Sequence, residues 1–147
     1  MTRNRSTGNR GFQPGQAMVE FALTAIVALL VLFLGIQFAL LGQAALAVGQ
    51  LAYQGARYAS INPNVSDAQV VSWMQGVASP TIASTDTKTL NISVSDASGT
   101  SPRPFQSTVT VTVTLDPVKK KLVLLPNPFF GVNFGGTISS TQNAMVD

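Results

Sequence analysis

The sequence predicts an α+β protein in which a long amino-terminal helix, partly in a membrane, carries a small head. An uncharged stretch runs from Phe21 to Ala56, whereas the chain after Ser60 turns to Ser, Thr and Val. Polar and apolar residues alternate without a fault from Ser107 to Leu115. The head is therefore expected to hold a short helix and an antiparallel sheet of about three strands. The predicted domains are a leader at 1–15, a long helix at 16–60 and the head at 61–147.

The apolar run from Phe21 to Leu41 is long enough to cross a bilayer. It exceeds the roughly 18 apolar residues that indicate a membrane-spanning helix, and about 20 residues at ~1.5 Å each cover a hydrocarbon core of ~30 Å. The segment from Gly42 to Ser60 contains no proline and keeps helical character. One helix is therefore expected over 16–60, transmembrane at about 17–41, which continues for several turns outside the membrane.

The first 15 residues are polar, punctuated by glycine and proline, and contain Arg3, Arg5 and Arg10. This composition predicts a basic leader without a fold of its own. By the positive-inside rule the leader stays in the cytoplasm and the head lies outside. Beyond the leader the basic and acidic residues balance, so no positive field remains for binding nucleic acid.

The composition excludes several kinds of catalytic and metal site. The chain has no cysteine and no histidine, which rules out disulfides, Cys or His metal ligands, and Ser-His or Cys-His catalysis. The acids Asp67, Asp86, Asp96 and Asp116 stand apart in the sequence, and none is paired at a spacing that builds a site. We therefore expect no catalytic residue, no metal and no cofactor, and a structural role instead of an enzymatic one.

Glu20 is an acid at the edge of an otherwise uncharged span. A carboxylate at bilayer depth costs about 2.5–3.5 kcal/mol on insertion scales, less near an interface. In one interpretation Glu20 snorkels to the headgroups and favours the positive end of the helix dipole. In the other it pairs with a cation, the free amino terminus that cleavage after Gly15 would create.

The segment GQAMVEF, from Gly15 to Phe21, resembles the processing site of type IV prepilins. Joined to the apolar run and to GARYA at Gly55–Ala59, it is similar to the TadE-like minor pilins, or pseudopilins, of tight-adherence (Flp) pilus systems. The resemblance implies that a prepilin peptidase cuts between Gly15 and Gln16, which makes Glu20 the fifth residue of the mature chain.

The same resemblance implies a single-pass protein of the cytoplasmic (inner) membrane and leaves open a place in the extracellular pilus. The implied partners are the major Flp pilin, a second minor pilin, the prepilin peptidase and the inner-membrane assembly platform. The chain departs from the short Flp major pilins, which have almost no head. This difference favours a minor role such as initiation of assembly.

Two other functions remain open. Ala45-Leu46-Ala47 matches an A-x-A signal-peptidase site, which would release a soluble protein that begins at Val48. The apolar run is longer than the 7–15 residues usual in such a signal. Alternatively the chain is an unprocessed, membrane-tethered binding protein that begins at Met1. The amino-terminal residue of the mature protein separates these functions.

Small residues recur at a spacing of seven along the long helix. This pattern predicts a face for close packing against neighbouring helices. Alternatively the face packs under the chain's own head, or the pattern reflects composition alone. The residues are Gly35, Gly42, Gly49 and Ala56, with Ala45, Ala52 and Ala59 three positions after the last three.

In the head, Ser66 and Gln69 have the spacing of a capping box that opens a helix over Asp67–Val77, with Trp73 expected to anchor the core. The loop Val118–Gly136 is rich in apolar residues and is expected to cover the apolar face of the sheet, the alternative being an exposed patch. Its lysines at 119–121 are expected in solvent or near headgroups. The predicted strands are Thr89–Ser95, Ser107–Leu115 and Thr137–Val146.

Overall fold

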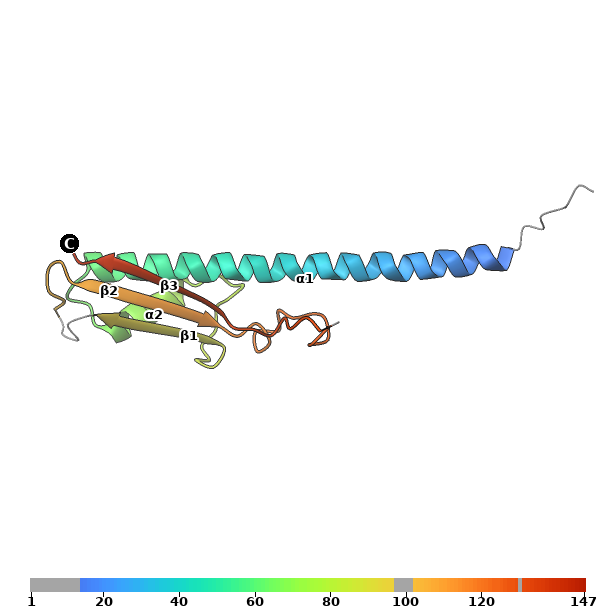
Figure 1. The fold of residues 1–147 in the computed structure, drawn as a ribbon. Helices are drawn as coiled ribbons and strands as arrows, with labels where there is room; N and C mark the ends of the chain where they lie inside the picture. Colours follow the sequence, from blue (N-terminus) through green and yellow to red (C-terminus); the bar gives the residue numbers. More distant parts are fainter. Residues whose placement is uncertain (1–13, 97–101, 130) are drawn as a thin grey trace, which may run out of the picture. The chain divides into compact units, whose positions relative to one another are not determined.

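The computed structural model describes residues 14–96, 102–129 and 131–147. Its element order confirms the α+β class (Figure 1). The chain divides into two compact units, one ending at Leu34 and one formed by Gly35–Asp147, which we call the distal unit. The elements are helix α1 (Pro14–Ile61), helix α2 (Asp67–Val77) and strands β1 (Leu90–Asp96), β2 (Thr108–Leu115) and β3 (Ile138–Met145).

Helix α1 begins at Pro14, two residues earlier than predicted. Proline suits the first turn of a helix, because its fixed φ is helical and its missing N–H would have no partner there. The helix ends at Ile61, where Pro63 disfavours helical geometry in Asn62. The side-chain amide of Asn62 donates to the carbonyl oxygen of Tyr58 at 2.9 Å and so satisfies a terminal acceptor.

The part of α1 up to Leu34 presents large apolar side chains to its surroundings. Met18 and Phe21 are both 76% exposed. By length and composition α1 is able to cross a membrane. A helix with this much unburied apolar surface fits a single-pass membrane protein.

Helix α2 has the predicted bounds and the predicted capping box. The Ser66 hydroxyl accepts from the backbone N–H of Gln69, and the Gln69 side chain accepts from the backbone N–H of Ser66 at 3.0 Å. Val70 and Met74, one turn apart, are the buried residues of this helix. Trp73 lies at the edge of the core instead of anchoring it, stacked on Tyr58 with ring centroids 4.3 Å apart.

The three strands form an antiparallel sheet in the order β1-β2-β3, which confirms the expected sheet. β1 is shifted by one residue from the predicted Thr89–Ser95, β2 starts one residue later than predicted, and β3 is one residue shorter at each end. In the central strand, Val111 lies opposite Val94 of β1 and Gln142 of β3. The faultless alternation of β2 puts every second side chain inside the core, and Val109, Val111, Val113 and Leu115 are all fully buried.

The core of the distal unit is not built from the residues after Ser60 alone, because α1 supplies part of it. Helices α1 and α2 approach closely where Gly55 meets Met74: a Cβ atom at Gly55 would lie 2.4 Å from the Met74 sulfur. α1 also passes near β3, since a Cβ at Gly49 would lie 4.0 Å from Ser140 Oγ. The core residues of α1 are Ala44, Val48, Leu51, Ala52, Ala56 and Ala59.

Candidate processing site and helix face

The predicted processing residues, Gly15, Gln16 and Glu20, all lie in the first turns of α1 and are exposed. Apart from its neighbours in the helix, no atom of the described residues lies within 4 Å of a Cβ placed at Gly15, so the residue before the predicted cleavage point has open space beside it. The first four N–H groups of a helix have no partner within it, so the turn that holds the bond is the easiest to unwind. Residues 1–13 of the predicted leader lie outside the described residues.

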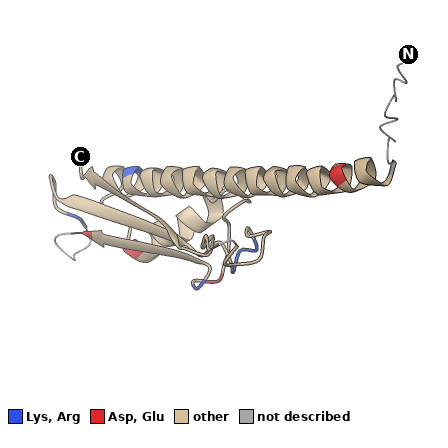
Figure 2. Cartoon of the chain, turned by 45° about the vertical axis from the view of Figure 1, so that its right-hand side comes forward, with Lys and Arg blue, Asp and Glu red and all other residues tan. Residues whose placement is uncertain are grey.

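Glu20 is the one acid in α1, and Arg57 is its one basic residue (Figure 2). The backbone carbonyl of Glu20 accepts from the hydroxyl of Thr24 at 2.9 Å. Between residue 14 and the carboxyl terminus, in the ranges described, no salt bridge to Glu20 forms. Within these ranges its carboxylate therefore has no salt-bridge partner.

The seven small residues of the predicted packing face divide into two groups. Ala52, Ala56 and Ala59 are at most 2% exposed and belong to the core of the distal unit, and Gly49 is partly buried. Gly35, Gly42 and Ala45 are exposed. The second half of the face is therefore covered by the chain itself, and only the first half is free for a neighbouring helix.

Gly42 and Ala45 line an open groove of about 510 Å³ between α1 and the segment before β3. Because these two residues have little or no side chain, the groove reaches down to the helix backbone. Phe38 and Phe134 close one side, with their rings edge to face at a centroid distance of 5.7 Å. The groove is thus apolar and sits on the distal unit.

A family model described as TadE-like protein matches residues 15–57. Residues 15–57 are TadE-like. The match begins at Gly15, the first residue of the predicted processing site, and ends at Arg57 within GARYA. No curated protein and no solved structure matches the chain. The TadE-like family points to a protein associated with tight-adherence pili, a structural class.

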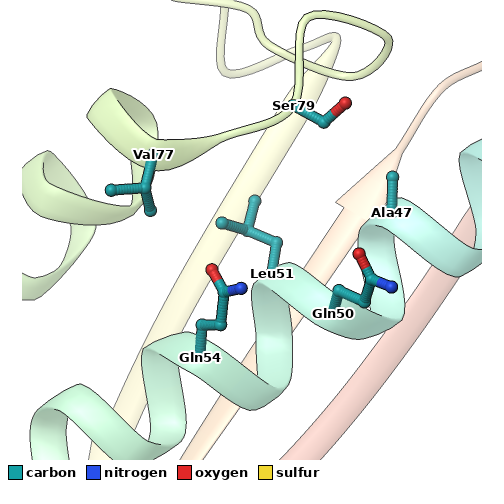
Figure 3. Close-up of a pocket in the computed structure, with 6 residues that line it drawn as sticks. All are labelled: Ala47, Gln50, Leu51, Gln54, Val77 and Ser79. Atoms are coloured by element: carbon teal, nitrogen blue, oxygen red, sulfur yellow. The ribbon is translucent and has the colours of Figure 1, made fainter.

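A small cavity lies beside the TadE-like segment (Figure 3). Its volume of about 90 Å³ holds about three water molecules. Gln50, Gln54 and Ser79 provide its polar groups, and no titratable side chain lines it. Across the described ranges no group of three or more acids, Cys or His could hold a metal ion. The cavity therefore offers neither acid-base nor metal chemistry.

Gln37 of the TadE-like segment is fully buried, and sequence reasoning missed it. Its side-chain amide donates to the carbonyl of Leu122 at 3.2 Å, and its oxygen accepts from the N–H of Leu124 at 2.7 Å. The apolar loop accordingly packs along α1, with only Leu122 reaching the edge of the core. The prediction placed this loop over the apolar face of the sheet; the structure shows its backbone paired with Gln37 of α1, which offers both a donor and an acceptor.

Arg103 forms a buried charge cluster that corrects the description of the acids as isolated. Its guanidinium, 1% exposed, donates to Asp67 at 2.5 Å and to the carbonyl of Val65 at 2.8 Å, and its Nε lies 3.5 Å from Asp96 Oδ2. The cluster joins the start of α2 to the end of β1. Because 36 residues separate Arg103 from Asp67, no local spacing could have indicated the pair.

Asp116 fixes the turn at the start of the apolar loop, Val118–Gly136. Its carboxylate accepts from the backbone N–H groups of Lys119 and Val118, and these bonds, the Lys119 one foremost, lower the pKa of Asp116. The lysines that follow are bound locally: the ammonium of Lys119 donates to Lys88 O at 3.1 Å, and that of Lys120 donates to Ala83 O. Of the three lysines expected in solvent or near headgroups, Lys119 and Lys120 therefore donate hydrogen bonds to backbone carbonyl groups.

Proposed function

We propose that the protein is a minor pilin, or pseudopilin, that takes part in the assembly or initiation of a tight-adherence type IV pilus. The observation that carries the proposal is the TadE-like match, which starts at Gly15 and covers the uncharged helix with its single acid. The exposed apolar side chains of α1 support membrane residence before assembly.

In this proposal a prepilin peptidase cuts the bond between Gly15 and Gln16. The new amine of Gln16 lies four residues before Glu20, which is one helical turn and hence the same face of α1. The carboxylate then neutralises the amine of its own chain or of a neighbour. Neutralisation removes the cost of holding two separate charges at the edge of the hydrocarbon.

The proposed topology places the leader in the cytoplasm and the distal unit outside the inner membrane, since Arg3, Arg5 and Arg10 precede the span. The partners in the proposal are the prepilin peptidase, the inner-membrane assembly platform, the major Flp pilin and a second minor pilin. Gly35, Gly42 and Ala45 form the face proposed to meet a pilin helix, because they are the exposed part of the small-residue pattern.

The core of the distal unit disfavours the secreted alternative. Cleavage after Ala47 would cut α1 between Ala44 and Val48, both of which are fully buried in that core. It would also detach Gln37 from the loop backbone that it binds. A released protein beginning at Val48 would thus lack part of its own core.

Processing is the first test of the proposal. When the full chain is produced in cells with a prepilin peptidase of a tight-adherence system, we expect intact mass and amino-terminal sequencing to find Gln16 first. The Gly15→Leu variant should remain at Met1, because a bulky side chain replaces the residue beside the scissile bond. Gly35→Leu, an exposed glycine elsewhere on α1, is the matched control and should be cut normally. A wild-type chain that keeps Met1 would support the tethered binding protein, and one that starts at Val48 the secreted form.

The proposed helix face gives a second test. Gly42→Leu should lower recovery of the protein with sheared pili by at least tenfold, because the added side chain separates two closely packed helix backbones. Nothing lies within 4 Å of a Cβ at Gly42, so folding and membrane insertion should not change. Gln43→Leu places the same side chain ~100° around the helix and serves as the control. Equal recovery of both variants would contradict the role of this face.

A further inference from the structure

We infer that the loop of residues 122–129 and 131–136, which we call the boundary loop, lies in the headgroup region of the bilayer as a second membrane contact beside α1. The proposed partner is a phospholipid surface. The inference concerns the protein before assembly and depends on α1 spanning the membrane, not on a role in a pilus.

The length of the span sets the depth of Gln37. A hydrocarbon core of ~30 Å takes about 20 helical residues. If the span starts after Glu20, it covers residues 21–40 and includes Gln37; if it starts at Met18, with Glu20 just inside one edge, it ends at Gln37. In both placements Gln37 lies at the edge of the hydrocarbon or within it.

The boundary loop packs against α1 at this depth. Gln37 bonds the backbone of Leu122 and Leu124, and Phe38 contacts Phe134. Figure 1 shows the loop lying beside α1, past the ends of β2 and β3. The headgroup layer is roughly 5–7 Å thick on each side, which corresponds to about four residues of helix. A segment held at residues 37 and 38 therefore cannot avoid that layer.

The boundary loop exposes apolar side chains, and several of its backbone groups are paired within the protein. Leu124 is 56% exposed and Val132 is 49% exposed. Phe129 and Val132 bond each other through their backbones at 3.0 and 2.9 Å, and the N–H of Phe134 donates to Asn127 Oδ1 at 3.0 Å. Non-helical backbone tolerates membrane depth only when its polar groups are satisfied within the protein.

The polar residues of the boundary loop place it among headgroups and not among acyl chains. Asn127 and Asn133 are exposed beside the apolar side chains, and both accept backbone bonds through their side-chain oxygens. Such a mixture suits the interface, where apolar bodies and hydrogen-bonding groups are both accommodated. The pairing by Gln37 joins this loop to the helix that enters the bilayer.

Site-directed spin labelling tests the inference on the full chain, which contains no native cysteine. Leu124→Cys and Val132→Cys would each carry a nitroxide, in vesicles of phosphatidylethanolamine and phosphatidylglycerol. Accessibility to oxygen, which concentrates in lipid, would be compared with accessibility to a water-soluble nickel chelate. The controls are Val31→Cys, exposed in the span, and Ser93→Cys, exposed on β1.

We expect the oxygen-to-nickel ratio at Leu124→Cys and Val132→Cys to exceed that at Ser93→Cys severalfold and to stay below that at Val31→Cys. A ratio equal to that at Ser93→Cys would place the loop in water and overturn the inference. Low accessibility to both reagents would also overturn it, because a protein partner or a second copy would then cover the loop. Circular dichroism of each labelled variant checks that the fold is kept.

Discussion

Replacement of Arg103 by leucine is expected to lower the free energy of unfolding of the distal unit by about 3–5 kcal/mol, the usual cost of removing one partner from a buried ion pair. The Asp96 side chain is 4% exposed and would lose its nearby guanidinium. The carbonyl of Val65 would lose its donor as well. Most of the loss therefore comes from the buried Asp96 and Val65 groups, which lose the guanidinium, and little from Asp67, whose side chain is half exposed.

Urea unfolding of the full chain in detergent measures this effect, followed by the fluorescence of Trp73, the single tryptophan, which stacks on Tyr58. Arg57→Leu removes an exposed arginine and should change the unfolding free energy little. The double variant Arg103→Leu/Asp96→Asn should regain part of the loss, because no buried charge remains. A loss below about 1 kcal/mol for Arg103→Leu would show that the cluster does not hold α2 and β1 together.

The second large effect is expected for Gly55→Leu, which should destabilise the distal unit by about 3 kcal/mol through overpacking. Even a Cβ atom at this position would lie 2.4 Å from the sulfur of Met74, which is fully buried. Gly42→Leu makes the same substitution on the same helix with no atom within 4 Å, so its unfolding free energy should stay close to that of the wild type.

A double-mutant cycle with Met74→Ala separates overpacking from a loss of helix propensity. If the clash is the cause, Gly55→Leu/Met74→Ala should be less destabilised than the sum of its two single variants, because leucine fills space that Met74 vacates. Additive effects would instead indicate that the two helices do not meet at this point.

The parts of the fold that the sequence predicted are those set by short, local patterns of residues. The alternation of β2 matches its four buried side chains, and the Ser66 capping box opens α2 at the predicted residue. Both signals are local, since each depends on the geometry of one element. The predicted start of α1 was two residues too late, because proline was taken as a helix breaker. Proline also fits the first turn of a helix, and α1 begins at Pro14.

The small-residue pattern shows why the candidate site was only partly predictable. Close packing against another chain and close packing against the same chain require the same Gly and Ala spacing. Only the fold reveals that Ala52, Ala56 and Ala59 are already covered, whereas Gly42 is not. The predicted processing residues, in contrast, lie within one short motif, so proposing them requires no knowledge of the fold.

The contacts of Gln37 and Arg103 lay beyond sequence reasoning for a different reason. Each joins segments far apart in the chain, 85 residues from Gln37 to Leu122 and 38 from Arg103 to Val65. A lone glutamine in an apolar run and a lone arginine in a loop give no indication of the backbone groups that they will meet. Tertiary structure alone creates both sites.

The passage of α1 into the core of the distal unit has a mechanical consequence. Between Ala44 and Ala59 the helix contributes six core residues spread over about four turns. A force along this part of α1 would act on these contacts in shear and all at once, so that they would not break one after another. A force on this part of α1 would therefore have to break these contacts together before the helix left the core of the distal unit.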